Sequence, residues 1–421
     1  MIRSGFLFFL AVAVSISCSK APVSLSPEGE GPSIPIVYIT TEGAAPVVSK
    51  DDYIEGTIII EDKAGMYSDE SCFEAPMKIK GRGNTTWNMP KKPWRIKLDE
   101  KACILGMSTD KDWCLLANYS DKTLIRNMTA MRLSEICGLS WSPRMVPVEV
   151  YFNGEYQGCY TFAEHKKVSS ERVDIDVDAG ACYLELDQSL DEYACFFTDH
   201  GIPLMFSDPE KPSYELFNST IEYFNSFERA LYAEDFLIRE DHYSKYFDVG
   251  SLINFFIIQE LSKNIDGDLR KSSFLVKEPG KPIEMYHVWD FDIAFGNADY
   301  FTSDFGVPNG AQGWYVKDFS AAGKNTGWIW RMFQDPSFVE AVKERWDELL
   351  PELKTAIPEY IDEMSLLLSH AQARNFQRWP ILDKEVWPNL VCMGSYEGEV
   401  RYFKNFYLER LAWIDENLKS L

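Results

Sequence analysis

The sequence predicts a mixed α+β fold with a β-rich N-terminal lobe and a helix-rich C-terminal lobe. Before residue 187, short apolar stretches and alternating apolar and polar residues dominate, which is typical of strands. After about residue 190, long segments carry apolar residues at helical spacing. The sequence contains no internal repeat. We therefore expect an N-terminal lobe over residues 37–186 and a C-terminal lobe over residues 187–421.

The start of the chain has the pattern of a targeting segment. Arg3 precedes an apolar run over residues 5–14 that is too short to span a bilayer comfortably. The run ends at Cys18 in a Ser-Ile-Ser-Cys motif that resembles the lipobox of bacterial lipoproteins. We expect a signal peptide over residues 1–17, a lipidated Cys18 and a tether over residues 18–36; the alternative is an ordinary secretory signal with a chance cysteine.

This pattern predicts an exported bacterial lipoprotein of the cell envelope, on the outer membrane or the surface, which contacts the membrane only through its lipid anchor. The formal net charge of −23 argues against nucleic acid as a partner. A phosphate ligand would need a locally basic pocket or a metal ion. The nine cysteines include no C-x-x-C pair and histidine is scarce, so we do not expect a zinc site.

The N-terminal lobe is expected to consist mainly of strands. Residues 148–162 form the clearest hairpin pattern, because Asn153 and Gly154 suit the positive φ angles of a type I′ turn. Residues 121–137 interrupt the strands with a helical pattern. The remaining predicted strands are residues 58–60, 77–80, 94–98 and 182–186.

The C-terminal lobe is expected to be built from helices. Ser337 is the expected N-cap of one of them, because it follows Asp335-Pro336 and precedes an apolar pattern. The predicted helices are residues 213–236, 247–263, 337–350, 352–369 and 398–420.

The stretch from residue 247 to residue 292 carries the strongest chemical signal. A helix that is apolar on nearly all sides leads into Asp266 and Asp268, and a predicted hairpin follows and ends at Asp290 and Asp292. A hairpin brings its two ends together, so Asp266 and Asp290 should be neighbours. Neighbouring carboxylates repel unless a cation intervenes, which favours Mg²⁺ bound by carboxylates and phosphate oxygens. The alternative interpretation is that these residues are caps and turn residues on a solvated edge.

The same order of helix, acidic loop, hairpin and acidic end places a catalytic Asp beside a magnesium-binding Asp in protein-kinase-like folds. In the N-terminal lobe, Arg82 and Asn84 lie in a glycine-containing loop, and Lys92 and Lys97 follow. Glycine lets backbone amides approach phosphate, and basic side chains supply charge. This loop is not a P-loop, and a solvated basic strand is the alternative interpretation.

Together these motifs resemble the spore-coat-protein-H (CotH) kinase family. The motifs that carry the resemblance are R-G-N-T-T-W, K-K-P-W-R-I-K-L, L-L-A-N-Y-S-D-K-T-L-I-R-N, V-E-V-Y-F-N-G-E-Y-Q-G-C-Y-T-F-A-E-H, Y-L-E-L-D, N-I-D-G and V-W-D-F-D-I-A-F-G-N. They occur in the family's own order over roughly residues 75–300. The resemblance implies an atypical protein-kinase-like fold with two lobes, which uses ATP and Mg²⁺ or Mn²⁺ to phosphorylate Ser or Thr of secreted or envelope proteins.

The resemblance also implies roles for individual residues. Asp266 would be the catalytic Asp, and Asp290 would hold the metal with help from Asp292. Lys97, or otherwise Lys92, would contact phosphate. Glu164 would be the acidic partner of that lysine. Arg82 and Asn84 would line the phosphates, and Glu185 would lie in the segment that touches adenine.

One position departs from the family pattern. Members often carry an Asn five residues after the catalytic Asp as a second metal ligand, and this chain has Lys271 there. A charged lysine cannot bind Mg²⁺. Asp268 or Asp292 could substitute, or the protein could be a catalytically silent binding or assembly protein of the envelope. The tryptophan content and paired carboxylates leave a carbohydrate-active protein as a third interpretation.

Overall fold

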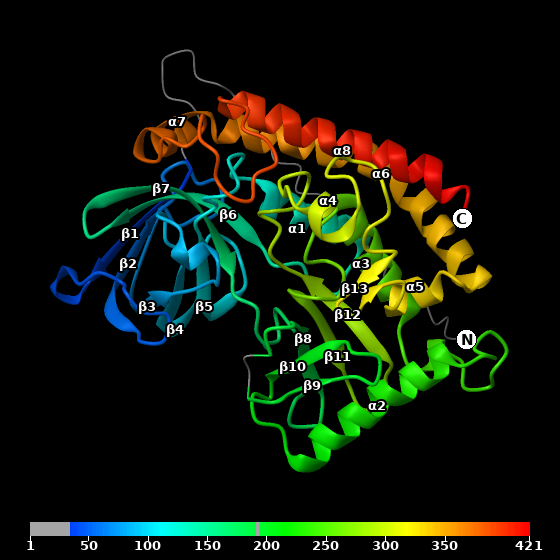
Figure 1. Cartoon of the computed structure of the whole chain (residues 1–421). Coiled ribbons are helices and arrows are strands. Elements are labelled where there is room, and N and C mark those ends of the chain that lie inside the picture. The colour runs from blue at the N-terminus through cyan, green and yellow to red at the C-terminus, as the bar shows by residue number, and fades with distance from the viewer. Residues whose placement is uncertain (1–33, 191–192) are drawn as a thin grey trace, which may run out of the picture.

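The computed structural model describes residues 34–190 and 193–421 (Figure 1). The predicted signal peptide, Cys18 and nearly all of the predicted tether lie outside the described residues. Ile34 is buried and the first strand begins at Ile36, so the packed chain already starts before residue 37. Among the described residues, no helix is both long and apolar enough for a membrane span.

Seven strands close into a barrel in the order β1-β2-β3-β4-β5-β7-β6. All pairs are antiparallel except β1 with β6. Alternation decides which side chains face inward: on β4, Trp94, Ile96 and Leu98 are buried, whereas Lys97 is exposed. The strands are β1 (Ile36–Thr41), β2 (Ile54–Glu61), β3 (Cys72–Gly81), β4 (Trp94–Cys103), β5 (Thr109–Leu116), β6 (Met145–Phe152) and β7 (Glu155–Glu164).

The β6–β7 hairpin has the turn that its sequence predicts. Asn153 and Gly154 adopt φ angles of 48° and 81°, which a type I′ turn requires.

A five-stranded sheet in the order β12-β11-β8-β10-β9 lies beside the barrel. Its strands are β8 (Cys182–Leu186), β9 (Cys195–Phe197), β10 (Pro203–Asp208), β11 (Ser273–Lys277) and β12 (Ile283–Val288). The predicted hairpin is present as β11 and β12, with Ser273 opposite Val288. Strand β8 was expected in the N-terminal lobe, but it hydrogen-bonds with β10 and β11 of this second sheet.

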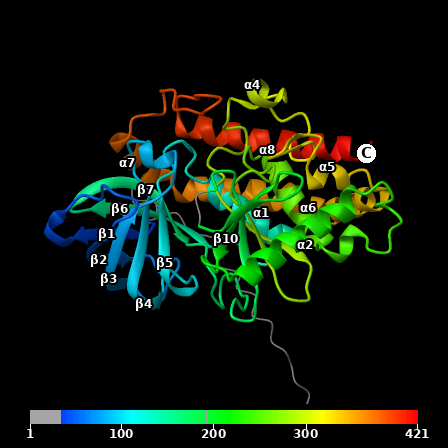
Figure 2. The same cartoon turned by 60° about the horizontal axis from the view of Figure 1, so that its bottom comes forward.

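Helices fill the rest of the molecule (Figures 1 and 2). The helices are α1 (Arg126–Cys137), α2 (Tyr214–Tyr232), α3 (Val249–Ser262), α4 (Phe301–Phe305), α5 (Trp328–Met332), α6 (Pro336–Leu367), α7 (Ser369–Arg378) and α8 (Tyr396–Leu418). Helix α3 is buried and packs against α1, α6 and α8. Figure 2 shows the barrel on one side of the molecule and the helices on the other.

Several helix boundaries differ from the sequence predictions, most clearly those of α1 and α6. The helices predicted over 337–350 and 352–369 form the single helix α6, which contains Pro351 and Pro358. Its N-cap is Asp335 and not Ser337: the Asp335 carboxylate accepts a hydrogen bond of 2.8 Å from the Ser337 amide. Helix α1 begins only at Arg126, because Asp121 accepts hydrogen bonds from the Thr123 and Arg126 amides in the preceding loop.

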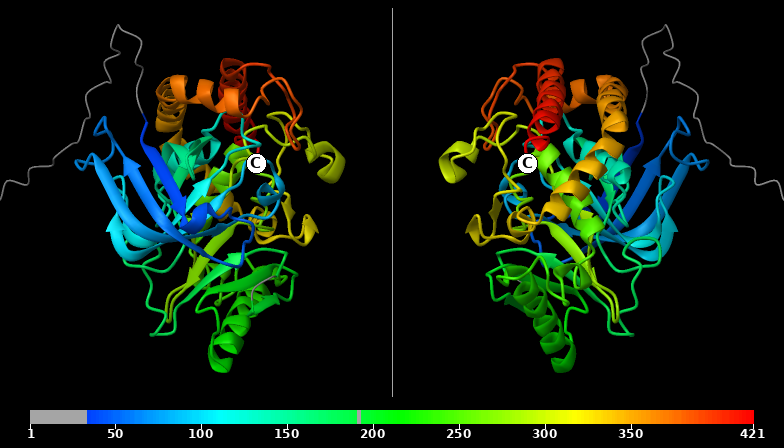
Figure 3. Two further views of the ribbon diagram at one scale, coloured as in Figure 1. Left: turned by 90° about the vertical axis from the view of Figure 1, so that its left-hand side faces the viewer. Right: turned by 90° about the vertical axis from the view of Figure 1, so that its right-hand side faces the viewer.

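The C-terminal helices fasten the barrel to the rest of the molecule. Asn375 on α7 accepts hydrogen bonds from the Cys159 amide at 3.0 Å and from the buried Lys91 ammonium at 2.9 Å. Arg374 pairs with Glu149 of β6 at 2.6 Å. Helices α6 and α8 lie side by side over this junction (Figure 3). The barrel and the helical part are therefore held together by contacts between residues that are far apart in the sequence.

Candidate active site

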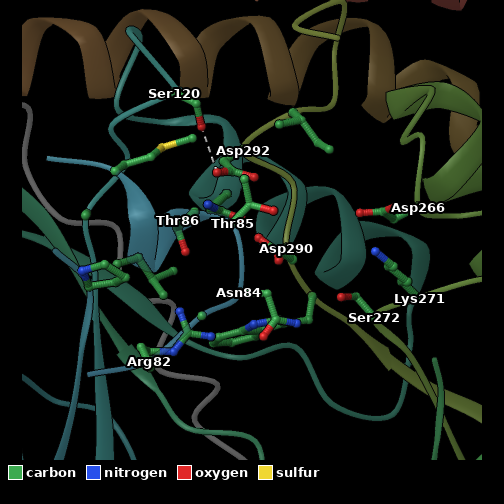
Figure 4. Close-up of a pocket in the computed structure, with 18 of the residues that line it drawn as sticks. Arg82, Asn84, Thr85, Thr86, Ser120, Asp266, Lys271, Ser272, Asp290 and Asp292 are labelled. Carbon is green, nitrogen blue, oxygen red and sulfur yellow. Dashed lines mark hydrogen bonds between the residues drawn. The ribbon is translucent and has the colours of Figure 1, made fainter. Parts of the chain in front are cut away.

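A cavity of about 380 Å³ lies where the barrel meets the second sheet and the loops beside it. The barrel contributes the loop after β3, with Arg82 and Asn84. Figure 4 shows Asp290 in the middle of the cavity, Asp266 and Lys271 on one side, and Arg82 on the other. The charged side chains that line it are Arg82, Lys166, Glu185, Asp187, Asp266, Lys271, Asp290 and Asp292.

Asp266 lies in the loop that follows the buried helix α3. Lys263 ends α3 in a left-handed conformation, and the Asp266 amide donates a hydrogen bond of 3.3 Å to the Asn264 side chain. Burial raises the pKa of the Asp266 carboxyl to about 6; Lys271 opposes the shift and Asp290 adds to it. A carboxyl group with this pKa is mostly ionised at neutral pH. Because its pKa lies close to neutral pH, it can both accept and release a proton.

Asp290 and Asp292 follow strand β12. Asp290 is exposed and has a φ angle of 68°, a left-handed conformation that few residues other than glycine, asparagine and aspartate adopt readily. The turn is fixed by Phe291, which is buried and whose amide donates a hydrogen bond of 2.7 Å to Asn127 of α1. Asp292 is buried and accepts a hydrogen bond of 3.0 Å from the Ser120 hydroxyl. Burial and the neighbouring Asp290 raise the pKa of the Asp292 carboxyl.

The donor set at Asp290 and Asp292 fits a hard divalent cation shared with a ligand. The carboxylates supply oxygen atoms, and a cation would relieve the repulsion that raises the Asp292 pKa. In the described part of the chain, no group of three or more His, Cys, Asp or Glu side chains could hold a metal ion by itself. Mg²⁺ typically takes one or two carboxylates and completes its shell with phosphate oxygens and water, so this pair suits a magnesium–nucleotide complex.

Asp268, the other candidate metal ligand, does not line the cavity. It is buried beneath the loop and pairs with Arg270 at 2.7 Å. Burial raises its pKa to about 6. Its place in the fold is that of a structural partner of Arg270.

The two lysines predicted to contact phosphate also lie outside the cavity lining. Lys97 is exposed on the outer face of β4, and the Lys92 ammonium donates a hydrogen bond of 2.7 Å to the Trp87 carbonyl. Glu164 is buried elsewhere in the barrel, where it accepts hydrogen bonds from the Ser108 and Arg144 amides. The expected pair between Glu164 and a β4 lysine is therefore not formed.

A different pair occupies the cavity. Lys166 forms an ion pair with Glu185 of β8, and its ammonium lies 4.1 Å from the centre of the Phe274 ring. Lys166 follows the end of β7 by two residues, where the chain leaves the barrel and crosses to the second sheet. The motif F-A-E-H-K-K contains both residues, and the cavity residue is Lys166 and not Glu164.

Asp187 is a further cavity residue that sequence reasoning missed. Its carboxylate accepts a hydrogen bond of 2.8 Å from the Ser189 amide and contributes to the raised pKa of Asp266. The Y-L-E-L-D motif ends at this residue, so its position next to Glu185 was the available signal.

The loop after β3 contributes the Arg82 guanidinium and the Asn84 side chain to the cavity lining. The Arg82 guanidinium lies 5.8 Å from the Trp289 ring centre. Gly83 has a φ angle of 80°, and a Cβ atom there would collide with the Thr86 hydroxyl. The loop therefore needs glycine to fold closely over the cavity.

The fold is a mixed α+β fold in which a β-rich N-terminal part and a helix-rich C-terminal part both line one cavity with charged side chains. A protein-family model described as CotH kinase protein matches residues 79–414. The chain therefore belongs to the CotH kinase family, whose membership implies a kinase-like fold, ATP and a protein substrate. No curated protein matches the sequence.

Proposed function

We propose that this protein is an exported atypical kinase that transfers the γ-phosphate of ATP to Ser or Thr hydroxyls of secreted or envelope proteins. One observation carries the proposal: Asp266, Asp290 and Asp292 line the same cavity as Arg82 and Lys166. Anchoring through Cys18 to the cell envelope is part of the proposal and follows from the N-terminal sequence pattern.

Asp266 is the proposed proton acceptor. As the acceptor hydroxyl oxygen bonds to the γ-phosphorus, its proton passes to the Asp266 carboxylate. The bond between the γ-phosphorus and the β–γ bridging oxygen breaks, and ADP leaves with that electron pair. Asp266 then returns the proton to water, which its pKa of about 6 permits at neutral pH.

The remaining cavity residues hold the nucleotide. Asp290 and Asp292 would bind Mg²⁺ or Mn²⁺, which supplies positive charge at the phosphate oxygens. Lys166 and Arg82 contact the phosphates, and Glu185 orients the Lys166 ammonium through their ion pair. Most stabilisation in phosphoryl transfer comes from such positioned charges, so their convergence on one cavity is the feature the reaction requires.

Phosphate transfer by the purified full-length protein tests the proposal. With radiolabelled ATP and Mg²⁺, we expect label on the protein itself or on a casein-like acceptor. Asp266→Asn should lower the rate by at least about a thousandfold, because it removes the proton acceptor and its charge. Asp290→Asn should abolish the increase in ATP affinity that Mg²⁺ causes in the wild type.

The matched control is Asp362→Asn on α6, where the carboxylate is exposed and pairs with Lys404 away from the cavity. It should transfer phosphate at the wild-type rate. Nucleotide binding without transfer by the wild type would favour the second candidate, a catalytically silent envelope binding protein, for which the presence of Lys271 in the cavity is the specific observation.

A further inference from the structure

Lys271 is the one lysine of the described cavity lining that forms no ion pair within 4.0 Å. Of the other two basic side chains there, Lys166 is paired with Glu185 and Arg82 lies over the Trp289 ring. Lys271 is half-buried, and Figure 4 shows its ammonium end directed into the cavity on the Asp266 side. A half-buried ammonium without a carboxylate partner is available for an anionic ligand.

The backbone holds Lys271 in this position. Its amide donates a hydrogen bond of 3.4 Å to the Asp266 carbonyl, and its own carbonyl accepts one of 3.1 Å from the Ser273 hydroxyl. Ser272, which lies between them, has a left-handed φ angle of 48°. Strand β11 begins immediately afterwards at Ser273. The turn therefore fixes the origin of the Lys271 side chain relative to the Asp266 carboxylate.

Lys271 also lines a second cavity of about 470 Å³, together with Ser189 and Phe197. It thus stands where the cavity containing Asp266 adjoins a second opening. If ATP occupies the first cavity, this end is where the transferred phosphate and the acceptor hydroxyl must meet, because Asp266 has to reach that hydroxyl.

Charge balance indicates what Lys271 does there. Besides Glu185, which is paired with Lys166, four more carboxylates line the first cavity, and ATP adds more negative charge. They belong to Asp187, Asp266, Asp290 and Asp292. Asp290 and Asp292 account for one cation. A second divalent ion near Asp266 would meet the Lys271 ammonium, which repels it and offers no lone pair.

We propose that Lys271 forms a phosphate-binding subsite for the terminal phosphate of ATP and replaces a second metal ion, so that this protein uses one divalent cation per nucleotide. The inference rests on the proposed function for the identity of the nucleotide. Lys271 would bind phosphate at the position where the family pattern has a metal-binding Asn, and one metal ion would bind in place of two.

Affinities of ATP and AMP, measured by titration calorimetry with and without Mg²⁺, test the subsite. Lys271→Met should weaken ATP binding by about tenfold or more, because a charged contact is lost, and leave AMP binding unchanged. The matched control is Lys277→Met, another half-buried lysine six residues further along, which lies outside this cavity. It should bind both nucleotides like the wild type.

The metal count is a second readout that does not depend on turnover. With a non-hydrolysable ATP analogue, electron paramagnetic resonance should detect one tightly bound Mn²⁺ in the wild type. Lys271→Asn, which replaces the ammonium by an oxygen ligand, should admit a second. Two tightly bound Mn²⁺ ions in the wild type would overturn the inference, as would an equal loss of ATP and AMP affinity in Lys271→Met.

The outcomes separate this inference from the proposed function. A wild-type protein that shows the Lys271-dependent preference for ATP over AMP but transfers no phosphate would keep the subsite and refute the kinase activity. If the wild type transfers phosphate but Lys271→Met binds ATP like the wild type, the kinase activity would be kept and the Lys271 subsite refuted. Failure of the wild type to bind either nucleotide would overturn both.

Discussion

Two groups of charges in this protein behave in opposite ways. Around Glu260, at the end of α3, the charges are compensated: one carboxylate oxygen accepts a hydrogen bond of 2.9 Å from the Tyr315 amide, the other accepts one of 2.8 Å from the Lys317 amide, and Arg410 of α8 completes an ion pair. Glu260 and Arg410 are both almost fully buried. This network joins α3, α8 and the segment after α4.

Three carboxylates of the cavity, those of Asp266, Asp290 and Asp292, have no ion-pair partner of this kind among the described residues. Within the described residues, no basic side chain comes within 4.0 Å of Asp266, Asp290 or Asp292. Burial, and then repulsion from Asp290, raises the pKa of Asp292. Where buried charge supports the structure of this fold, as at Glu260 and Arg410, protein groups match it. Where it is left unmatched, it faces a cavity, and a ligand must supply the balance.

The strongest way to break this comparison is to unbalance the Glu260 network. Glu260→Gln should lower the free energy of unfolding by about 3–5 kcal/mol, because it leaves the buried Arg410 guanidinium without its counter-ion. Urea unfolding measures the change. Asp290→Asn, which removes a carboxylate that only repels its neighbour, should leave stability equal or higher.

The matched control for this variant is Glu222→Gln on α2, where an exposed ion pair with Arg229 should contribute less than about 1 kcal/mol. If Glu260→Gln were as mild as this control, or if Asp290→Asn were as damaging as Glu260→Gln, the distinction between compensated and uncompensated charge would fail.

A smaller effect should come from removing a cation that lines the cavity. Lys166→Met should reduce the rate of phosphate transfer by about a hundredfold, since one positioned charge at the phosphates is lost. Lys97→Met, the lysine on the outer face of β4, should stay within about twofold of the wild type. The reverse ranking in the same radiolabel assay would return the phosphate-contacting role to Lys97.

The smallest expected effect concerns a buried neutral histidine on β12. His287 of β12 is fully buried and shares a hydrogen bond of 2.7 Å with the Tyr183 hydroxyl, and burial lowers its pKa to about 3. Between pH 6.5 and 3 the unfolded chain binds a proton here and the folded chain does not. The free energy of unfolding is therefore not lowered by this group above pH 6.5. It decreases as the pH falls below 6.5, by about 2 kcal/mol at pH 5.

His287→Gln should flatten this dependence, so that the slope of unfolding free energy against pH between 6 and 5 becomes shallower by about 1 kcal/mol per pH unit. Urea midpoints at several pH values measure it. An unchanged slope would show that His287 accepts a proton in the folded state. Burial also lowers the pKa of His165. The variant therefore keeps the part of the pH dependence of unfolding that comes from His165.

Much of the fold follows from local patterns in the sequence. Alternation on β4 and the Asn153-Gly154 turn predict the barrel strands and one hairpin, and the apolar surface of α3 predicts its burial. Helix ends do not follow in the same way: the two helices predicted on either side of Pro351 form the single helix α6, which packs against α8.

The acids of the candidate site follow from the local order of elements along the chain. Asp266 and Asp290 flank a short hairpin, and any such hairpin brings its two ends to the same edge, so their presence in one cavity needs no long-range information. Closely spaced carboxylates in one loop-and-hairpin unit are a local property of the chain.

Which cations lie in the cavity with these acids depends instead on how distant parts of the chain pack together. The alternating pattern of β4 shows that Lys97 and Ile96 point to opposite faces, but it does not show whether the outer face borders the cleft or solvent. That depends on how seven strands close and on where α7 fastens the barrel, contacts that join residues more than 200 positions apart. For this reason Lys166 and Asp187, which lie in crossing segments without a regular pattern, became visible as cavity residues only in the folded chain.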